Sequence, residues 1–189
     1  MTRWSTSLLE RALMVVVSAF LFVEFFRLNE YLFAALQHTQ SINWVFLPAG
    51  FRVLLVLVLG LHGALGIALG SLWLNLERFE QSSLVFSTLV CLASGLAPWL
   101  VKFAMEKSEL LDRQLMNINS ARLLQYVLVY AGVNALAHQA IFWVFAVQES
   151  QPWIDVWPMF VGDTLGAMIV LYTFKLSLPW LRGLLRPKA

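Results

Sequence analysis

The distribution of basic residues constrains the fold of this chain more than any other feature. Ten of its thirteen Lys and Arg residues fall in three groups, separated by apolar stretches long enough to cross a bilayer. The groups are Arg3 and Arg11; Lys102, Lys107, Arg113 and Arg122; and Lys175, Arg182, Arg186 and Lys188. Because Lys and Arg collect in cytoplasmic loops, we expect both termini and the 102–122 loop to be cytoplasmic.

Hydrophobic residues make up 60% of the chain, which exceeds the roughly 45–50% that is usual in soluble domains. A spanning helix needs roughly 20 residues, so membrane helices consume most of the 189 residues. We therefore expect one transmembrane domain over 1–189, in contact with the lipid bilayer and without a soluble catalytic domain. The net charge of +2 reflects topology, and we expect no nucleic-acid partner.

The apolar stretches predict an all-α, polytopic fold of about six transmembrane helices. An even number of spans returns the chain to its starting side, in agreement with the charge distribution. The Gly60-Leu61-His62-Gly63 junction predicts a tight turn between two helices, although one long bent element is the alternative. The expected spans are 8–28, 45–60, 63–76, 83–104, 121–147 and 157–178.

Five polar residues inside these spans, Glu24, Arg52, Asn134, His138 and Asp163, fall at mid-membrane or in its outer half. A charge in the hydrocarbon core costs about 2.5–3.5 kcal/mol on insertion scales, so such residues need partners or water. We hypothesise a cluster open to the outside, with Arg52 held between Glu24 and Asp163, because a guanidinium can bind two carboxylates or one anionic ligand. The alternative is an interhelical ion pair that only orients the helices.

Other candidate sites are weaker. The two readings of His138 are a single interhelical hydrogen bond and a titratable switch. His38 and Asp155 lie in predicted external loops without an evident role, and Cys91, the only cysteine, has no catalytic signature around it. The histidine and carboxylates inside the spans lack helical metal-ligand spacing. We expect no metal, no other cofactor and no enzymatic activity.

Small side chains follow one face of the third predicted span, at Gly63, Gly66 and Gly70. Small residues let helix backbones approach closely in a membrane, so this pattern indicates helix packing. The 105–121 segment, which alternates in charge sign, predicts a solvated cytoplasmic helix or loop.

Three short motifs carry a family resemblance. The first is Phe46-Leu47-Pro48-Ala49-Gly50-Phe51-Arg52 with an apolar run to Gly60, the second is the 119–124 entry to the fifth span, and the third is Gly162-Asp163-Thr164-Leu165-Gly166. Together they resemble membrane-associated sensor (MASE) domains of the first class. The family-matching positions are Pro48, Gly50, Gly60, Gly162 and Gly166, with Arg52 and Asp163 beside them.

This resemblance implies an integral membrane sensory module in a bacterial inner membrane. Such modules normally feed a cytoplasmic histidine kinase or diguanylate cyclase domain, whereas this sequence stops at Ala189 without one. The expected function is therefore detection of a signal or small ligand, with action through a separate protein partner. The alternative is a structural or accessory subunit of a larger membrane complex.

Overall fold

The computed structural model describes residues 7–39, 42–78, 83–147 and 151–185. In these ranges the chain forms six α-helices, so the predicted all-α class is confirmed. A short 3-10 helix, Ala34–Leu36, and two short antiparallel strands, β1 (Gln37–Thr39) and β2 (Ile42–Asn43), follow the first helix. The α-helices are α1 (Leu8–Phe33), α2 (Leu47–Leu59), α3 (Leu61–Arg78), α4 (Leu84–Lys107), α5 (Ser120–Val144) and α6 (Pro152–Leu185).

Three of these helices are long and apolar enough to cross a membrane, within the described residues. They are α4, α5 and the Pro152–Leu178 part of α6. The apolar helix α2 has 13 residues, and the apolar part of α3 covers Leu61–Leu76. Length and composition thus identify three spans where the sequence predicted six.

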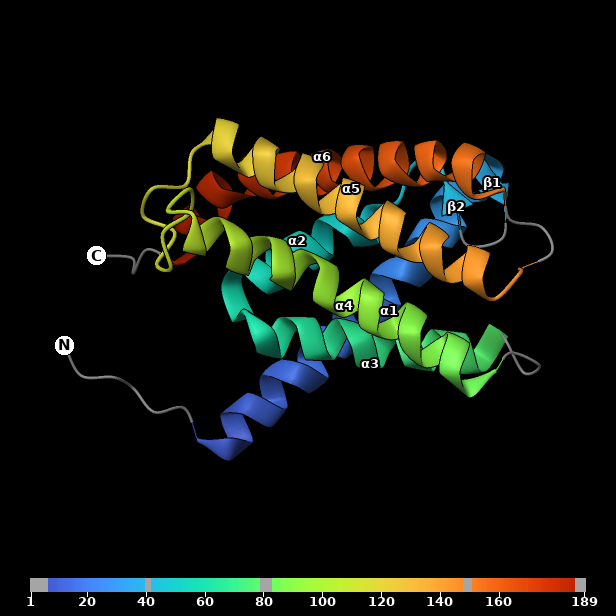
Figure 1. Cartoon of the computed structure of the whole chain (residues 1–189). Coiled ribbons are helices and arrows are strands. Elements are labelled where there is room, and N and C mark those ends of the chain that lie inside the picture. Colours follow the sequence, from blue (N-terminus) through green and yellow to red (C-terminus); the bar gives the residue numbers. More distant parts are fainter. Residues whose placement is uncertain (1–6, 40–41, 79–82, 148–150, 186–189) are drawn as a thin grey trace.

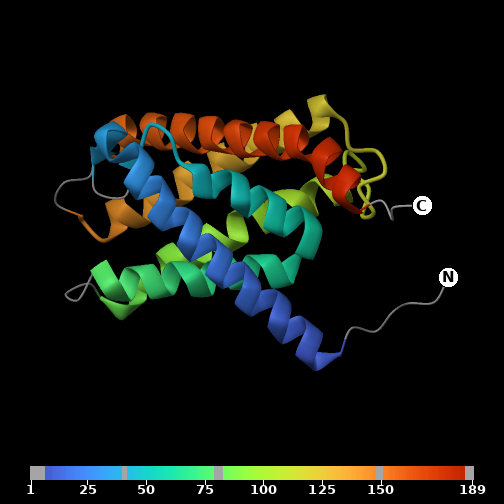
Figure 2. The ribbon, with the colours of Figure 1, turned by 180° about the vertical axis from the view of Figure 1, so that it is seen from behind.

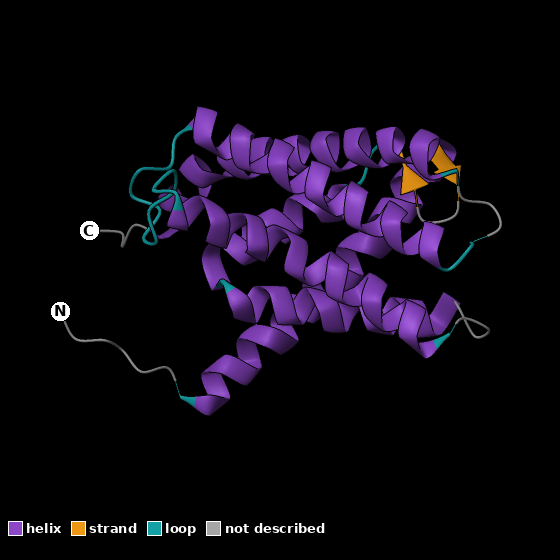
Figure 3. Cartoon of the chain, viewed as in Figure 1, coloured by secondary structure: helices purple, strands orange, loops and turns teal. Residues whose placement is uncertain are grey.

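The helices run back and forth between two ends of the molecule (Figures 1 and 2). At one end lie the α2–α3 turn, the α4–α5 loop, the start of α1 and the end of α6; we call this the basic end. At the other, the hairpin end, lie β1 and β2, which Figure 3 shows as the only strands drawn among the described residues. The N-terminal half of α1 projects from the bundle in both views.

Small residues set the closest helix contacts. A side chain on Gly66 of α3 would meet the Val15 carbonyl of α1, and one on Gly95 of α4 would meet the Ala64 carbonyl of α3. The close approach requires glycine at both positions. The predicted packing role of the small residues in the third span is therefore confirmed.

Gly60 forms the turn between α2 and α3. Its φ of 59° lies in the left-handed region, which glycine adopts without the penalty that a Cβ would impose. Its amide donates to the Val56 carbonyl at 2.9 Å and so closes the last turn of α2. The predicted tight turn is confirmed.

A non-helical segment, residues 42–46, lies in a groove on α6. A Cβ on Gly162 would meet the carbonyl of Asn43, and one on Gly166 would meet the carbonyl of Phe46. The Phe46 amide donates to the Gly162 carbonyl at 3.0 Å. We call residues 42–46 the groove segment, because the absence of side chains at the two glycines makes room for its backbone.

Asn29 of α1 fixes the point where the groove segment becomes α2. Its side-chain oxygen accepts the Leu47 amide at 2.8 Å, and Asn29 is buried. The first amides of a helix have no partner within the helix, so Asn29 caps α2 from another element. Pro48 is tolerated in this first turn because it lacks an amide that needs a partner.

Several boundaries differ from the sequence-based prediction. Helix α1 continues beyond residue 28 to Phe33, α6 begins at Pro152 rather than at 157, and the β1–β2 pair was not predicted. The α4–α5 connection is not uniformly solvated, since Leu111 is 2% exposed and packs in the core with Met105 and Tyr126. The apolar residues of this segment are interspersed with charged ones without a regular period, and so gave no signal for this anchoring.

Substitution of Gly166 by Ala should destabilise the protein strongly. The new methyl group would collide with the Phe46 backbone, and overpacking of this kind costs about 1–3 kcal/mol or more. Gly132→Ala on α5 is the matched control, because its nearest neighbour is a Phe160 ring carbon at 4.0 Å; it should be neutral or slightly stabilising. Thermal unfolding in detergent measures both, and equal transition temperatures would contradict the groove assignment.

Candidate functional site

A cavity of about 80 Å³ lies inside the bundle, toward the hairpin end. Every helix except the 3-10 turn contributes to its wall, and the groove segment closes part of it. Four of the five polar residues singled out from the sequence line it: Arg52, Asn134, His138 and Asp163. Its other lining residues are Phe22, Phe26, Ile42, Asn43, Phe46, Ser71, Leu74, Asn75, Phe86, Val90, Ser94, Phe142 and Met159.

Arg52 lies in the second turn of α2, and it is only 5% exposed. Its guanidinium carbon lies 5.1 Å from the ring centre of Phe22 and 5.2 Å from that of Phe46, within the range of cation–π attraction. Its edges donate to the Tyr130 hydroxyl at 3.3 Å and to the Ser94 hydroxyl at 3.4 Å. The buried cation is thus held by aromatic faces and neutral acceptors.

Ser94 of α4 connects Arg52 to His138 of α5. The Nδ1 of His138 lies 2.9 Å from the Asn134 carbonyl, which can only accept, so Nδ1 carries a proton. In the neutral ring Nε2 is then an acceptor, and the Ser94 hydroxyl donates to it across 3.2 Å. Donors and acceptors therefore alternate without conflict from Arg52 to the α5 backbone.

Asp163 of α6 is 2% exposed and accepts a hydrogen bond from the Asn134 amide nitrogen at 2.6 Å. Because a carboxylate can only accept hydrogen bonds, the side-chain nitrogen of Asn134 must face Asp163. The side-chain oxygen of Asn134 therefore points away from Asp163. In the part of the chain that the structure describes, no ion pair joins Asp163 to Arg52. Each buried charge is paired with neutral groups.

Two buried atoms of this network have no hydrogen-bond partner among the described residues: the Nε of Arg52 and the side-chain oxygen of Asn134. A buried polar group without a partner costs about 1–3 kcal/mol. A network whose only role was to lock the helices together would gain from satisfying these atoms. The two unpaired atoms therefore lower the free energy of unfolding below that of a fully hydrogen-bonded network.

Glu24 does not belong to this cluster. It lies on the outer face of α1, where it pairs with Arg27 at 3.2 Å, and the side chains are 45% and 50% exposed respectively. The rotation of α1 turns Phe22 rather than Glu24 toward Arg52. The expected placement of Arg52 between Glu24 and Asp163 is therefore wrong.

Sequence reasoning also missed Tyr130 and Ser94. Tyr130, Asn134 and His138 are spaced four residues apart, so they share one face of α5, and this polar stripe could have identified Tyr130. Ser94 gives no comparable signal, because serine is common in membrane helices. Its position facing both Arg52 and His138 depends on how α2, α4 and α5 pack.

The family-motif positions serve the backbone around the cavity. Pro48 is fully buried at the start of α2, and a side chain on Gly50 would meet Val170 of α6. With Gly162 and Gly166 accepting the groove segment, these residues bring α2 against α6. They position the helices that carry Arg52 and Asp163 but are not among the residues that line the cavity.

Cys91 of α4 is buried beside the cavity wall. Its sulfur accepts a hydrogen bond from the Asn75 amide at 3.2 Å, and the same nitrogen donates to the Ser71 carbonyl at 2.9 Å. Asn75 and Ser71 line the cavity. In the described residues no group of three or more His, Cys, Asp or Glu side chains is arranged to hold a metal ion.

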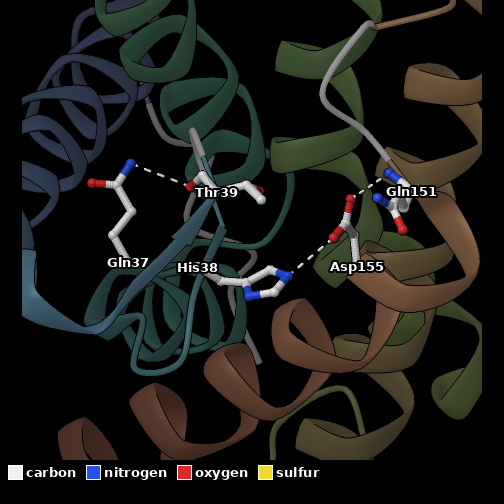
Figure 4. A network of polar contacts seen from close by, with 5 residues as sticks. All are labelled: Gln37, His38, Thr39, Gln151 and Asp155. Atoms are coloured by element: carbon white, nitrogen blue, oxygen red, sulfur yellow. Dashed lines mark hydrogen bonds and ion pairs between the residues drawn. The ribbon is translucent and has the colours of Figure 1, made fainter.

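The β1–β2 hairpin is fastened to α6 at the hairpin end (Figure 4). His38 Nε2 lies 3.1 Å from one oxygen of Asp155, and the other oxygen accepts the Gln151 amide at 2.7 Å. Asp155, expected in an external loop, is buried in the first turn of α6. Because Ile42 and Asn43 line the cavity, this contact holds the hairpin in place beside the cavity.

Comparison of the chain with protein-family models, with curated proteins and with solved structures finds no match. The resemblance to the first class of MASE domains therefore stays a prediction, and the site is interpreted from its geometry.

Replacement of Asn134 by Leu should destabilise the protein by about 2–4 kcal/mol, because it leaves the buried Asp163 carboxylate without its donor. The double variant Asn134→Leu/Asp163→Leu should recover part of this loss, since both partners become apolar. Gln125→Leu, on the exposed side of the same helix, is the control and should change little. Thermal unfolding of the wild type, of the single variants Asn134→Leu and Asp163→Leu, and of the double variant forms the cycle; additive losses would show that the two side chains do not interact.

Proposed function

We propose that the chain crosses a bacterial inner membrane six times, with the basic end in the cytoplasm. Successive helices connect alternately at the two ends (Figures 1 and 2), which is the arrangement that six crossings require. Lys107 and Arg122 flank the α4–α5 loop at the basic end. Positive charge on that side fits a cytoplasmic location.

The short helix α2 is compatible with a crossing. Its 13 residues rise about 20 Å, against a hydrocarbon core of about 30 Å. The groove segment supplies up to about 16 Å more. Non-helical backbone is tolerated at membrane depth where protein covers it, and here α6 does so at Gly162 and Gly166.

Within this topology, the chain acts as a membrane-embedded sensory or binding module. The observation that carries this proposal is the cavity lined by two buried, opposite charges, Arg52 and Asp163, that form no ion pair with each other. Charges inside a membrane are costly and usually mark ligand or ion pathways. The cavity receives a small ligand from the outer side, and its occupancy alters the packing of α2, α4, α5 and α6.

The module acts through a separate cytoplasmic protein. The α4–α5 loop, residues 108–119, is the longest described segment at the basic end between two helices. It joins the two helices that contribute Ser94 and His138, so a change at the cavity reaches this loop through the helices themselves. The end of α6 beyond Lys175 is the second contact surface.

The alternative is an accessory subunit of a larger membrane complex, with the polar network as an interhelical lock. Hydrogen bonds from Arg52 to α4 and α5 support such a lock. The unpaired Nε of Arg52 and the unpaired oxygen of Asn134 favour the binding module, because they make the lock incomplete.

Cysteine labelling tests the topology. In a Cys91→Ser background, Gln37→Cys at the hairpin end should react with a membrane-impermeant maleimide on intact cells. Glu109→Cys at the basic end should react only after the cells are opened. Both parent residues are exposed, so access to the reagent is decided by the membrane. The reverse labelling pattern would place the basic end outside.

Purification of the tagged chain in mild detergent, with mass spectrometry of the bound proteins, tests the function. We expect a cytoplasmic signalling enzyme to be recovered, and Arg113→Glu in the α4–α5 loop to reduce its recovery severalfold. Gln37→Glu at the hairpin end is the control and should leave recovery unchanged. Stoichiometric recovery of other membrane subunits, insensitive to Arg113→Glu, would favour the accessory-subunit alternative.

A further inference from the structure

We infer that the cavity binds a small zwitterion of the size of glycine, with its carboxylate toward Arg52 and its ammonium group toward Asp163. This inference rests on the proposed binding function and specifies the chemical class of the ligand. Three features of the cavity lead to it: two separate charges, a small volume, and walls that combine aromatic rings with neutral polar side chains.

The two charges lie on neighbouring helices that pack against each other. Arg52 comes from α2 and is bound by two hydroxyl groups, and Asp163 comes from α6 and is bound by one amide. Both residues line the same cavity, and they retain 5% and 2% exposure. In a low-dielectric interior, a simple anion would be attracted by Arg52 but repelled by Asp163. A simple cation would be attracted by Asp163 but repelled by Arg52. A zwitterion complements both charges and adds no net charge to the interior.

Asn134 positions the acceptor side of the site, because its nitrogen donates to Asp163. The Asp163 carboxylate can accept hydrogen bonds from an ammonium group, which has three donors. The Arg52 guanidinium offers planar donors that match a carboxylate. The acceptor for one end of a ligand and the donors for the other thus come from different helices, α6 and α2.

The volume limits the size of the ligand. The cavity measures about 80 Å³, roughly half of the ~150 Å³ in which an engineered protein cavity holds benzene. A molecule of about five non-hydrogen atoms fits this space, and a phospholipid headgroup does not. The wall also carries the rings of Phe22, Phe46, Phe86 and Phe142, beside neutral polar side chains such as Ser71 and Asn75.

The test uses the full chain in phosphatidylcholine nanodiscs, with glycine, acetate and methylammonium as separate probes. Thermal unfolding and equilibrium binding of radiolabelled glycine are both measured. We expect glycine to raise the transition temperature in a saturable manner, and acetate and methylammonium to have much weaker effects. Leucine, which exceeds the cavity in size, should not compete with glycine.

Two variants distinguish binding in the cavity from other effects. Val90→Phe on α4 fills the cavity without removing a charge, and Val85→Phe on the exposed face of the same helix is its matched control. Only Val90→Phe should abolish glycine binding. Asp163→Asn preserves the side-chain shape and should weaken glycine binding on the order of ten- to a hundredfold, as expected for a lost charged hydrogen bond, without weakening acetate binding. This second variant carries the test if Val90→Phe does not fold.

Two results would overturn the inference. If acetate or methylammonium alone stabilises the protein as well as glycine does, and Val90→Phe removes the effect, the ligand is a simple ion and only the chemical class is wrong. If none of the three probes binds, a glycine-sized zwitterion is likewise excluded. The proposed function is decided separately, by the partner recovered from cells, which does not depend on any of these probes.

Discussion

The contact between the groove segment and α6 determines the position of everything around the cavity. Two carbonyl groups lie against Gly162 and Gly166 so closely that no side chain fits between them. This contact sets where α2 begins, and therefore the depth and direction of Arg52 one to two turns later. The same stretch of α6 carries Asp163 between the two glycines. The positions of both buried charges thus follow from one backbone-to-backbone approach.

The polar interior illustrates how a membrane protein can retain an expensive residue. Arg52 is stabilised by two aromatic faces and two hydroxyl groups, rather than by a carboxylate in direct contact. Its hydrogen-bond partners among the described residues are neutral hydroxyl groups, and no carboxylate lies within ion-pair distance of it. The energetic cost of this arrangement is the incomplete hydrogen bonding of Arg52 and Asn134.

Much of the site was predictable from sequence, because depth along a helix depends only on span boundaries. Arg52, Asn134, His138 and Asp163 were expected at similar depth, and they line one cavity. Glu24 was misplaced because depth does not give helix rotation, and the nearly uniform apolarity of α1 offered no amphipathic face from which to read it. The groove segment, the hairpin and the His38–Asp155 contact depend on tertiary packing of short polar loops, for which no periodic pattern exists. The small residues of α3 were interpreted correctly, since glycine repeated on one helix face has few roles other than close backbone approach.

The loop between α4 and α5 has a further mechanical consequence. Leu111 anchors it in the core, the Leu111 amide donates to the Met105 carbonyl at 3.0 Å, and Asn117 accepts the Asp112 amide at 2.9 Å. The Arg122 side chain ties the far end to the Asn117 carbonyl at 3.0 Å. These contacts make the α4–α5 loop a rigid connection. A shift of α4 relative to α5 would therefore change the relative positions of the charged side chains on this loop.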